Sequence, residues 1–201
     1  MAKERIAFST KYKDLHKQWN LPRNKVNKII CVKEQQLVNE ILDNREFDIS
    51  NFYRDNRDDH EYVYDILEGR LMEEILVLFF EEKGFTVSKA GSDSDDVIHR
   101  SKGEKITTKP DLNVNGINIE VQFSTMGRRD FYHIKKGKGN RVLKGQNIVM
   151  FVVDNTYIII TKDNLAGCPV KPNGAWFMKE CYWFEAKDSD YRSTKDTINW
   201  L

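Results

Sequence analysis

The most informative stretch of the sequence is Lys109-Pro110-Asp111-Leu112-Asn113-Val114-Asn115-Gly116-Ile117-Asn118-Ile119-Glu120-Val121-Gln122-Phe123-Ser124. Within it, Asn115-Gly116 separates two runs in which apolar and polar residues alternate. A two-residue type I′ turn requires positive φ at both central positions, and Asn-Gly is the pair that best supplies it. The stretch therefore predicts a β-hairpin with its turn at Asn115-Gly116.

The two-residue turn determines which residues face each other across this hairpin. Asp111 is expected opposite Glu120, and Leu112 opposite Ile119. Because side chains alternate between the two faces, one face is apolar and is expected to be core. Its members are Leu112, Val114, Ile117, Ile119, Val121 and Phe123. The other face carries Asp111, Asn113, Asn118, Glu120, Gln122 and Ser124.

The polar face of the predicted hairpin places two carboxylates side by side. Opposite residues in such a ladder have Cβ atoms roughly 4.5–5.5 Å apart, so Asp111 and Glu120 would repel each other. Mg²⁺ is commonly held by one or two carboxylates together with substrate phosphate oxygens. A divalent cation at Asp111 and Glu120 is therefore expected. The alternative is a polar hairpin face that is exposed to solvent.

Length and composition describe a chain that can bury a real core. It has 201 residues, of which 40% are hydrophobic, enough for one domain or one domain with a small appendage. No apolar run is longer than that from Ile75 to Phe80, which is far too short to span a membrane, and the N-terminus has no apolar signal region. We expect a soluble, cytoplasmic protein without a membrane partner. The three cysteines and four histidines are scattered, which argues against a disulfide framework or a zinc site.

Charge is segregated along the chain although the net charge is only +1. Residues 1–33 contain nine basic and two acidic residues, and residues 128–144 contain seven basic and one acidic. Between them, residues 46–82 contain twelve acidic and three basic residues. Two basic segments that flank an acidic one favour a partner with negative charge.

Residues 12–30 predict two short helices joined by a turn. Asn20 lies where the chain must turn, Leu21 fills the corner, and Pro22 suits the first turn of a second helix that ends near Ile30. The stretch resembles a helix-turn-helix, although His16 and Asn20 occupy positions where a small residue and a glycine are usual. The second helix would offer phosphates and base edges the polar residues Arg23, Asn24, Lys25, Asn27 and Lys28. The alternative is an ordinary helical pair with a solvated basic face.

The rest of the chain predicts alternating helices and strands. Helices are expected at residues 33–44 and 66–83, and strands at 85–89, 97–99, 148–153 and 157–160. The aromatic tail, which includes Trp176, Phe177 and Trp183, predicts an added hairpin. Residues 47–64 are polar and acidic. We therefore expect a basic helical region at 1–64 and a main domain at 65–201.

From Ile66 to Thr161 this order of elements resembles the PD-(D/E)XK nuclease superfamily. The motif is Pro110-Asp111, then eight residues, then Glu120-Val121-Gln122. The resemblance implies an α/β (α+β) fold with a restriction endonuclease-like mixed central sheet flanked by helices. Gln122 replaces the lysine that is usual in the superfamily, although some restriction endonucleases with glutamine there are active.

The resemblance also implies roles for individual residues. Asp111, Glu120 and the main-chain carbonyl of Val121 would hold Mg²⁺, and Gln122 would orient the attacking water. Glu73 matches the helix acid of archaeal Holliday junction resolvases and would be a further catalytic residue and metal ligand, with Glu74 as the alternative. Ala90-Gly91-Ser92 is similar to a resolvase run that places Ser92 near the scissile phosphate.

A basic stretch that also contains aromatic residues follows the hairpin. In a nuclease its expected use is contact with DNA phosphates, and the alternative is a solvated helix face. The residues predicted to contact DNA are Arg128, Arg129, Lys135, Lys136, Lys138 and Arg141.

The sequence thus predicts a Mg²⁺-dependent DNA endonuclease, with Mn²⁺ as a substitute ion. Its target would be a specific sequence, as for restriction and homing enzymes, or a structure, as for junction resolvases. A homodimer is expected if both strands are cut at one site. The alternatives are a DNA-binding protein whose nuclease fold has lost catalysis, and a structural or protein-interaction domain.

Overall fold

The computed structural model describes residues 6–42, 57–91, 98, 109–124, 127–174 and 178–201. The chain divides into two compact units, one of Met1–Gly84 with Gly91–Lys109 and the other of Phe85–Ala90 with Pro110–Leu201. The first unit is helical in its described part, and the second contains all the described strands. The predicted mixed α and β class is confirmed.

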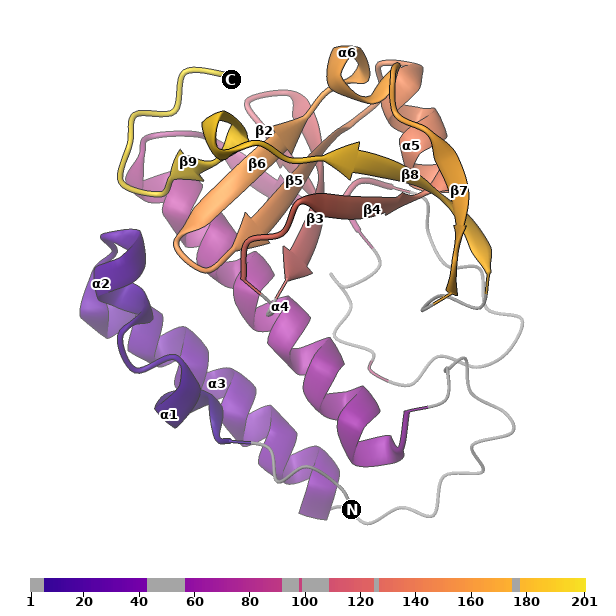
Figure 1. The fold of residues 1–201 in the computed structure, drawn as a ribbon. Coiled ribbons are helices and arrows are strands. Elements are labelled where there is room, and N and C mark those ends of the chain that lie inside the picture. Colours follow the sequence, from indigo (N-terminus) through magenta and orange to yellow (C-terminus); the bar gives the residue numbers. More distant parts are fainter. Residues whose placement is uncertain (1–5, 43–56, 92–97, 99–108, 125–126, 175–177) are drawn as a thin grey trace. The chain divides into compact units, whose positions relative to one another are not determined.

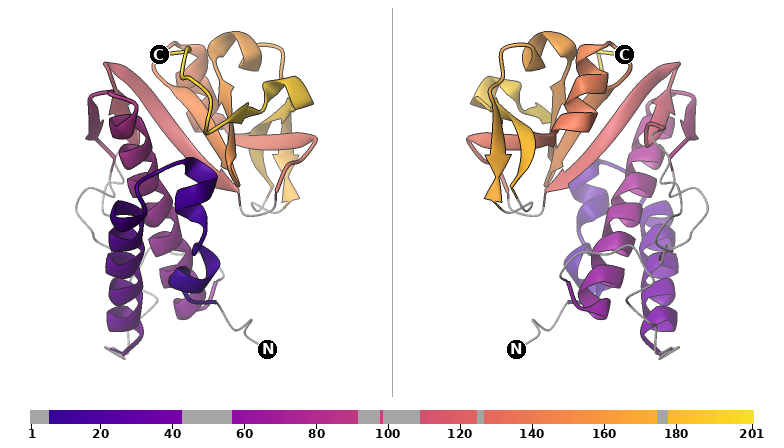
Figure 2. Two further views of the ribbon diagram at one scale, coloured as in Figure 1. Left: turned by 90° about the vertical axis from the view of Figure 1, so that its left-hand side faces the viewer. Right: turned by 90° about the vertical axis from the view of Figure 1, so that its right-hand side faces the viewer.

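The first unit is built on two long helices, α3 (Arg23–Leu42) and α4 (Asp59–Glu82), preceded by the short α1 (Phe8–Lys11) and α2 (Leu15–Trp19). Figure 2 shows α3 and α4 lying side by side. Lys25 pairs with Glu82 at 2.6 Å and Lys33 with Glu74 at 3.0 Å, so the two helices run antiparallel. Among the described residues, no helix is both long enough and apolar enough to cross a bilayer.

The turn between α2 and α3 follows the predicted helix-turn-helix pattern. Asn20 is in the left-handed region (φ 53°, ψ 49°), which is the conformation that favours glycine and that Asn tolerates better than most residues. Leu21 is buried behind it. The two helices predicted at 22–30 and 33–44 are instead the single helix α3, because no helix-breaking residue separates them.

Helix α4 begins earlier than the apolar spacing predicted. Its N-cap is Asp58, whose carboxylate accepts a hydrogen bond from the Glu61 backbone N–H at 2.7 Å, and its first helical residue is Asp59. The predicted boundary at residue 64 therefore falls inside α4. The division into domains 1–64 and 65–201 stays a prediction.

A six-stranded mixed sheet forms the centre of the second unit (Figure 1). Its strand order is β1-β2-β3-β5-β6-β9. Strands β3 and β5 are parallel, and the other neighbours are antiparallel. The strands are β1 (Val87–Lys89), β2 (Leu112–Val114), β3 (Ile117–Ser124), β5 (Ile148–Val153), β6 (Thr156–Ile160) and β9 (Arg192–Ser193).

The hairpin predicted at 111–124 is strands β2 and β3. Asn115 and Gly116 both have positive φ, 49° and 87°, as a type I′ turn requires. Leu112 pairs with Ile119 and Val114 with Ile117, which is the predicted register. Leu112, Val114 and Ile119 are completely buried, whereas Ile117, Val121 and Phe123 are half-buried, so three of the six predicted core residues of this face lie in the core.

A three-stranded sheet of order β4-β8-β7 completes the second unit (Figure 1). It combines β4 (Phe131–Lys135) with the predicted tail hairpin, β7 (Val170–Asn173) and β8 (Lys179–Glu185). One core cluster joins this sheet to β5, β6 and the helices α5 (Lys136–Leu143) and α6 (Lys162–Leu165). A short 3-10 helix, η4 (Asp188–Asp190), precedes β9. Trp176, Phe177 and most of the strand predicted at 97–99 lie outside the described residues.

Candidate active site

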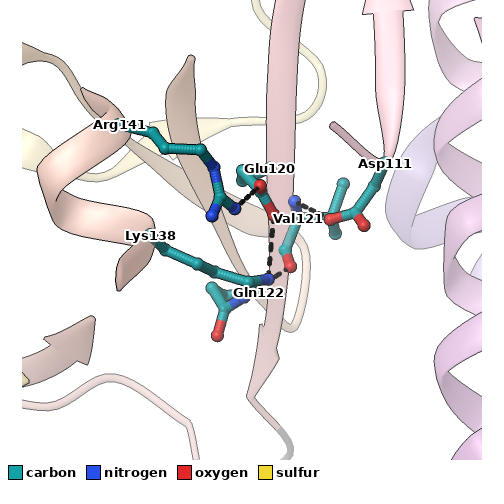
Figure 3. A network of polar contacts seen from close by, with 6 residues as sticks. All are labelled: Asp111, Glu120, Val121, Gln122, Lys138 and Arg141. Carbon is teal, nitrogen blue, oxygen red and sulfur yellow. Dashed lines mark hydrogen bonds and ion pairs between the residues drawn. The ribbon is translucent and has the colours of Figure 1, made fainter. Parts of the chain in front are cut away.

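Glu120, on the central strand β3, is the most deeply buried acid of the described part of the chain, with 1% of its surface exposed. Its two carboxylate oxygens are held by two basic side chains of α5 (Figure 3). Lys138 Nζ lies 2.9 Å from Oε2, and Arg141 donates a hydrogen bond from Nη2 to Oε1. A buried carboxylate therefore lies between two cations.

The burial of Glu120 follows from the position of β3 inside the sheet. In the parallel register Glu120 is level with Val149 and Gln122 with Phe151. Val149 and Phe151 belong to the core cluster that includes Val142 of α5, so the polar face of β3 is covered by a helix. The alternative of a polar hairpin face exposed to solvent is therefore wrong for Glu120.

Asp111 directly precedes β2, and its side chain contacts the backbone of β3 (Figure 3). Its Oδ2 accepts a hydrogen bond from the backbone N–H of Val121 at 2.7 Å. Its backbone carbonyl accepts another from the Ala90 N–H at 3.2 Å, next to the end of β1. Backbone groups of two neighbouring segments thus hold Asp111 in place.

Val121 and Gln122 complete the cluster at this point of β3. The Gln122 side-chain amide donates to the Val121 carbonyl oxygen at 2.8 Å. That oxygen is the main-chain atom predicted to bind metal, so Gln122 lies beside it. Figure 3 shows the six residues of this cluster together: Asp111, Glu120, Val121, Gln122, Lys138 and Arg141.

The sequence predicted that a cation would compensate the charge of Asp111 and Glu120. In the structure the charge of Glu120 is balanced by Lys138 and Arg141, which are themselves about a quarter exposed, at 27% and 24%. The donor atoms still suit Mg²⁺, since two carboxylates and a carbonyl are hard oxygen ligands. Within the part of the chain that the structure describes, no three His, Cys, Asp or Glu side chains form a metal-binding group.

The predicted helix acids lie on α4, in the first unit. Both Glu73 and Glu74 are half-buried. Glu74 forms an ion pair with Lys33, which is only 3% exposed, and this contact gives Glu74 a structural role between the two long helices. The catalytic and metal-binding roles of Glu73 stay predictions. Ser92 lies outside the described residues.

The basic stretch of residues 128–144 does not form one surface. The Arg128 guanidinium lies over the Tyr191 ring, 4.5 Å from its centroid, and Lys136 pairs with Glu180 at 2.6 Å. The backbone N–H of Arg129 donates to the hydroxyl groups of Tyr132 and Tyr191, and Lys135 is exposed at the end of β4. Two further members, Lys138 and Arg141, contact Glu120.

The five residues predicted to contact DNA from the helix-turn-helix lie in the first turns of α3. They are Arg23, Asn24, Lys25, Asn27 and Lys28, and all are exposed. Lys25 forms an ion pair with Glu82 of α4. The Lys25 side chain therefore points to the side of α3 that packs on α4. Arg23 and Asn27 line a groove of about 540 Å³ between α1 and α3.

The contacts of Lys138 and Arg141 with Glu120 were not predicted from the sequence, which assigned both residues to DNA phosphates. Their spacing of three residues on a helix was the available signal, because residues at i and i+3 share a face. A search of family models, of curated proteins and of solved structures finds no match to this chain.

Proposed function

We propose that this protein is a metal-dependent DNA endonuclease that hydrolyses phosphodiester bonds. The observation that carries the proposal is the buried carboxylate of Glu120 between Lys138 and Arg141, beside Asp111 and Gln122 on one hairpin. Acidic and basic groups of this kind are needed where phosphate charge must be balanced and water oriented.

Stability alone is a poor explanation for this cluster. Removing the Glu120 carboxylate from water costs several kcal/mol, and apolar side chains of similar volume often stabilise a fold as well as or better than a buried ion pair. Glu120 lies level with Val149 of β5, which belongs to the apolar core cluster. The charged cluster therefore supports a chemical role.

The ligands for Mg²⁺ or Mn²⁺ would be the carboxylates of Asp111 and Glu120 and the carbonyl of Val121. When bound, the ion would neutralise phosphate charge and lower the pKa of a water molecule. Gln122 is neutral at all ordinary pH values, so it orients water through hydrogen bonds and accepts no proton. Lys138 and Arg141 reach solvent with about a quarter of their surface and can donate to phosphate oxygens.

Recognition of duplex DNA is assigned to α3, whose exposed Arg23, Asn24, Asn27 and Lys28 are of the types that contact phosphates and base edges. One catalytic centre cuts one strand. Cleavage of both strands at one site therefore requires a homodimer, and its two-fold symmetry would be mirrored in the target.

Cleavage assays with purified full-length protein test the proposal. Supercoiled plasmid, linear duplex and a four-way junction are incubated with Mg²⁺, Mn²⁺ or EDTA. The variants are Asp111→Asn and Glu120→Gln, and the matched controls are Asp163→Asn and Glu180→Gln, which change exposed acids of the same unit. Circular dichroism establishes that each variant is folded.

We expect metal-dependent cleavage that the two site variants abolish and the two controls retain. The preferred substrate then separates sequence recognition from junction resolution. Cleavage that persists in Asp111→Asn and Glu120→Gln would identify a contaminating nuclease and overturn the proposal.

A second candidate function is DNA binding without hydrolysis. It is favoured by Gln122, which cannot act as a base, and by Glu120, whose two oxygens already have cationic partners in the protein. Such a protein needs no affinity for Mg²⁺ at Asp111 and Glu120. DNA binding with no cleavage under any metal, and no Mg²⁺ heat signal in titration calorimetry, would establish this second function.

A further inference from the structure

We propose that the outer face of the three-stranded sheet β4-β8-β7 binds an unpaired nucleic-acid strand. The inner face of this sheet carries Tyr132, Ile134, Tyr182 and Phe184, which belong to the core cluster. Residues between them in sequence point to the opposite face, because side chains alternate along a strand. Both faces belong to the second unit, and the outer one is separate from the side chain of Glu120.

Three rings form a cluster on the outer face. Phe131 is 45% exposed and lies edge-on to Trp183, with ring centroids 6.4 Å apart. His133 is opposite Trp183 in the strand register, with centroids 4.1 Å apart. The indole N–H of Trp183 donates to the Lys171 carbonyl at 3.4 Å, which fixes the orientation of the ring. The cluster is therefore rigid and partly open to solvent.

Basic residues continue the same face of the sheet. Lys135 and Lys171 lie on either side of Cys181 in the register, and Lys179 is two residues further along β8. All three lysines are exposed. Burial lowers the pKa of His133, and the positive charge of Arg129 lowers it further. Among the described residues of these three strands, the acid on this face is Glu185, opposite Phe131, and the three lysines give these residues a net positive charge.

Aromatic rings beside a row of lysines are the features that bind single strands. Unpaired bases stack on aromatic side chains, and lysines neutralise the backbone phosphates. A duplex keeps its bases stacked on each other and cannot use the rings in this way. We therefore expect bases to stack on Phe131 and Trp183. Backbone phosphates would contact Lys135 and Lys171. The inference requires no metal and no hydrolysis, so it stands or falls separately from the nuclease proposal.

Fluorescence anisotropy with full-length protein in EDTA tests the inference. The probes are labelled oligo(dT), oligo(U) and a DNA hairpin duplex of equal nucleotide number, and the first two distinguish DNA from RNA. Phe131→Leu removes the exposed ring and keeps an apolar side chain, and Lys135→Gln with Lys171→Gln removes two charges. The matched controls are Val170→Ala, on the other face of β7, and Lys162→Gln, on α6.

We expect Phe131→Leu to weaken single-strand binding about five-fold or more, since stacking of one base has at least this effect. The double lysine variant should reduce the salt slope of single-strand binding by about 1.4, or about 0.7 per phosphate contact. Trp183→Phe should retain affinity, because it keeps an aromatic ring. Duplex affinity and both controls should change less than two-fold.

Two results overturn the inference. One is the absence of single-strand binding by the wild-type protein, which leaves this face to a different class of partner. The other is equal loss of single-strand and duplex binding in Phe131→Leu, which identifies a general effect on the fold.

Discussion

The Nζ atom of Lys138 lies 2.9 Å from Oε2 of Glu120, and this contact joins α5 to the central strand β3. Arg141, one turn along the same helix, pairs with the other carboxylate oxygen, Oε1. The helix is thus held to the sheet by these charged contacts and by apolar packing of Val142.

Removal of Lys138 should destabilise the fold because it leaves a buried carboxylate with one cation instead of two. We expect Lys138→Met to lower the free energy of unfolding by about 1–3 kcal/mol, less than the loss of a sole partner, since Arg141 remains. Urea unfolding measures this difference. In a Glu120→Gln background the same substitution should lower the free energy of unfolding much less. Equal decreases in both backgrounds would show that Lys138 and Glu120 are not coupled.

Lys138→Met should also tighten Mg²⁺ binding if the proposed metal site is correct. A divalent ion at Glu120 repels Lys138 and Arg141, so loss of one positive charge reduces the cost of binding. We expect a Mg²⁺ affinity at least several-fold higher by titration calorimetry, together with slower cleavage because a phosphate contact is lost. Unchanged or weaker Mg²⁺ binding would contradict a metal ligand role for Glu120.

Gly139 allows α5 to lie close against Tyr182 of β8. A Cβ atom at Gly139 would lie 2.3 Å from Cδ2 of the Tyr182 ring, whereas one at Gly137 meets nothing within 4 Å. We expect Gly139→Ala to lower the free energy of unfolding by about 1–3 kcal/mol, because the added methyl group overpacks this contact. Gly137→Ala in the same helix should stabilise by about 0.4–1 kcal/mol by restricting the unfolded chain. Thermal unfolding of the two variants, which should move in opposite directions, checks both.

The hairpin shows how much local sequence can determine. Asn115-Gly116 was sufficient to predict the turn and the register, because both depend on residues close together in the chain. The extent of α3 was missed, although it is also local, because helix periodicity defines ends poorly when no breaker or cap marks them.

The surroundings of Glu120 could not be predicted in the same way. The alternation in β3 distinguishes two faces, but it does not say that α5 covers the polar one. That depends on the parallel pairing of β3 with β5 and on the return of residues 136–143 across the sheet, both of which are long-range contacts. The sequence therefore predicted Glu120 as a site residue but did not predict its contacts with Lys138 and Arg141.

Exposed basic residues at the start of α3 should contribute to duplex binding without affecting stability. We expect Lys28→Ala to reduce the slope of log affinity against log salt by about 0.9, the value for one phosphate contact. Asn27→Ala should weaken binding to a preferred sequence more than to random DNA if it reaches a base edge. Lys17→Ala is the control, since Lys17 is an exposed lysine of α2 that pairs with Asp14. An equal effect of Lys17→Ala would indicate only non-specific electrostatic attraction.

His133 should make the stability of the protein depend on pH. Burial lowers the pKa of its imidazole below the ordinary value of 6.5, and the nearby charge of Arg129 lowers it further. The unfolded chain therefore takes up this proton more readily than the folded protein. The contribution to stability is fully present above about pH 6.5 and is lost progressively as the pH falls below that value towards the folded pKa. Urea unfolding at several pH values should show a steeper loss on acidification for the wild type than for His133→Gln. An imidazole pKa at or above 6.5 in an NMR titration would contradict the predicted direction.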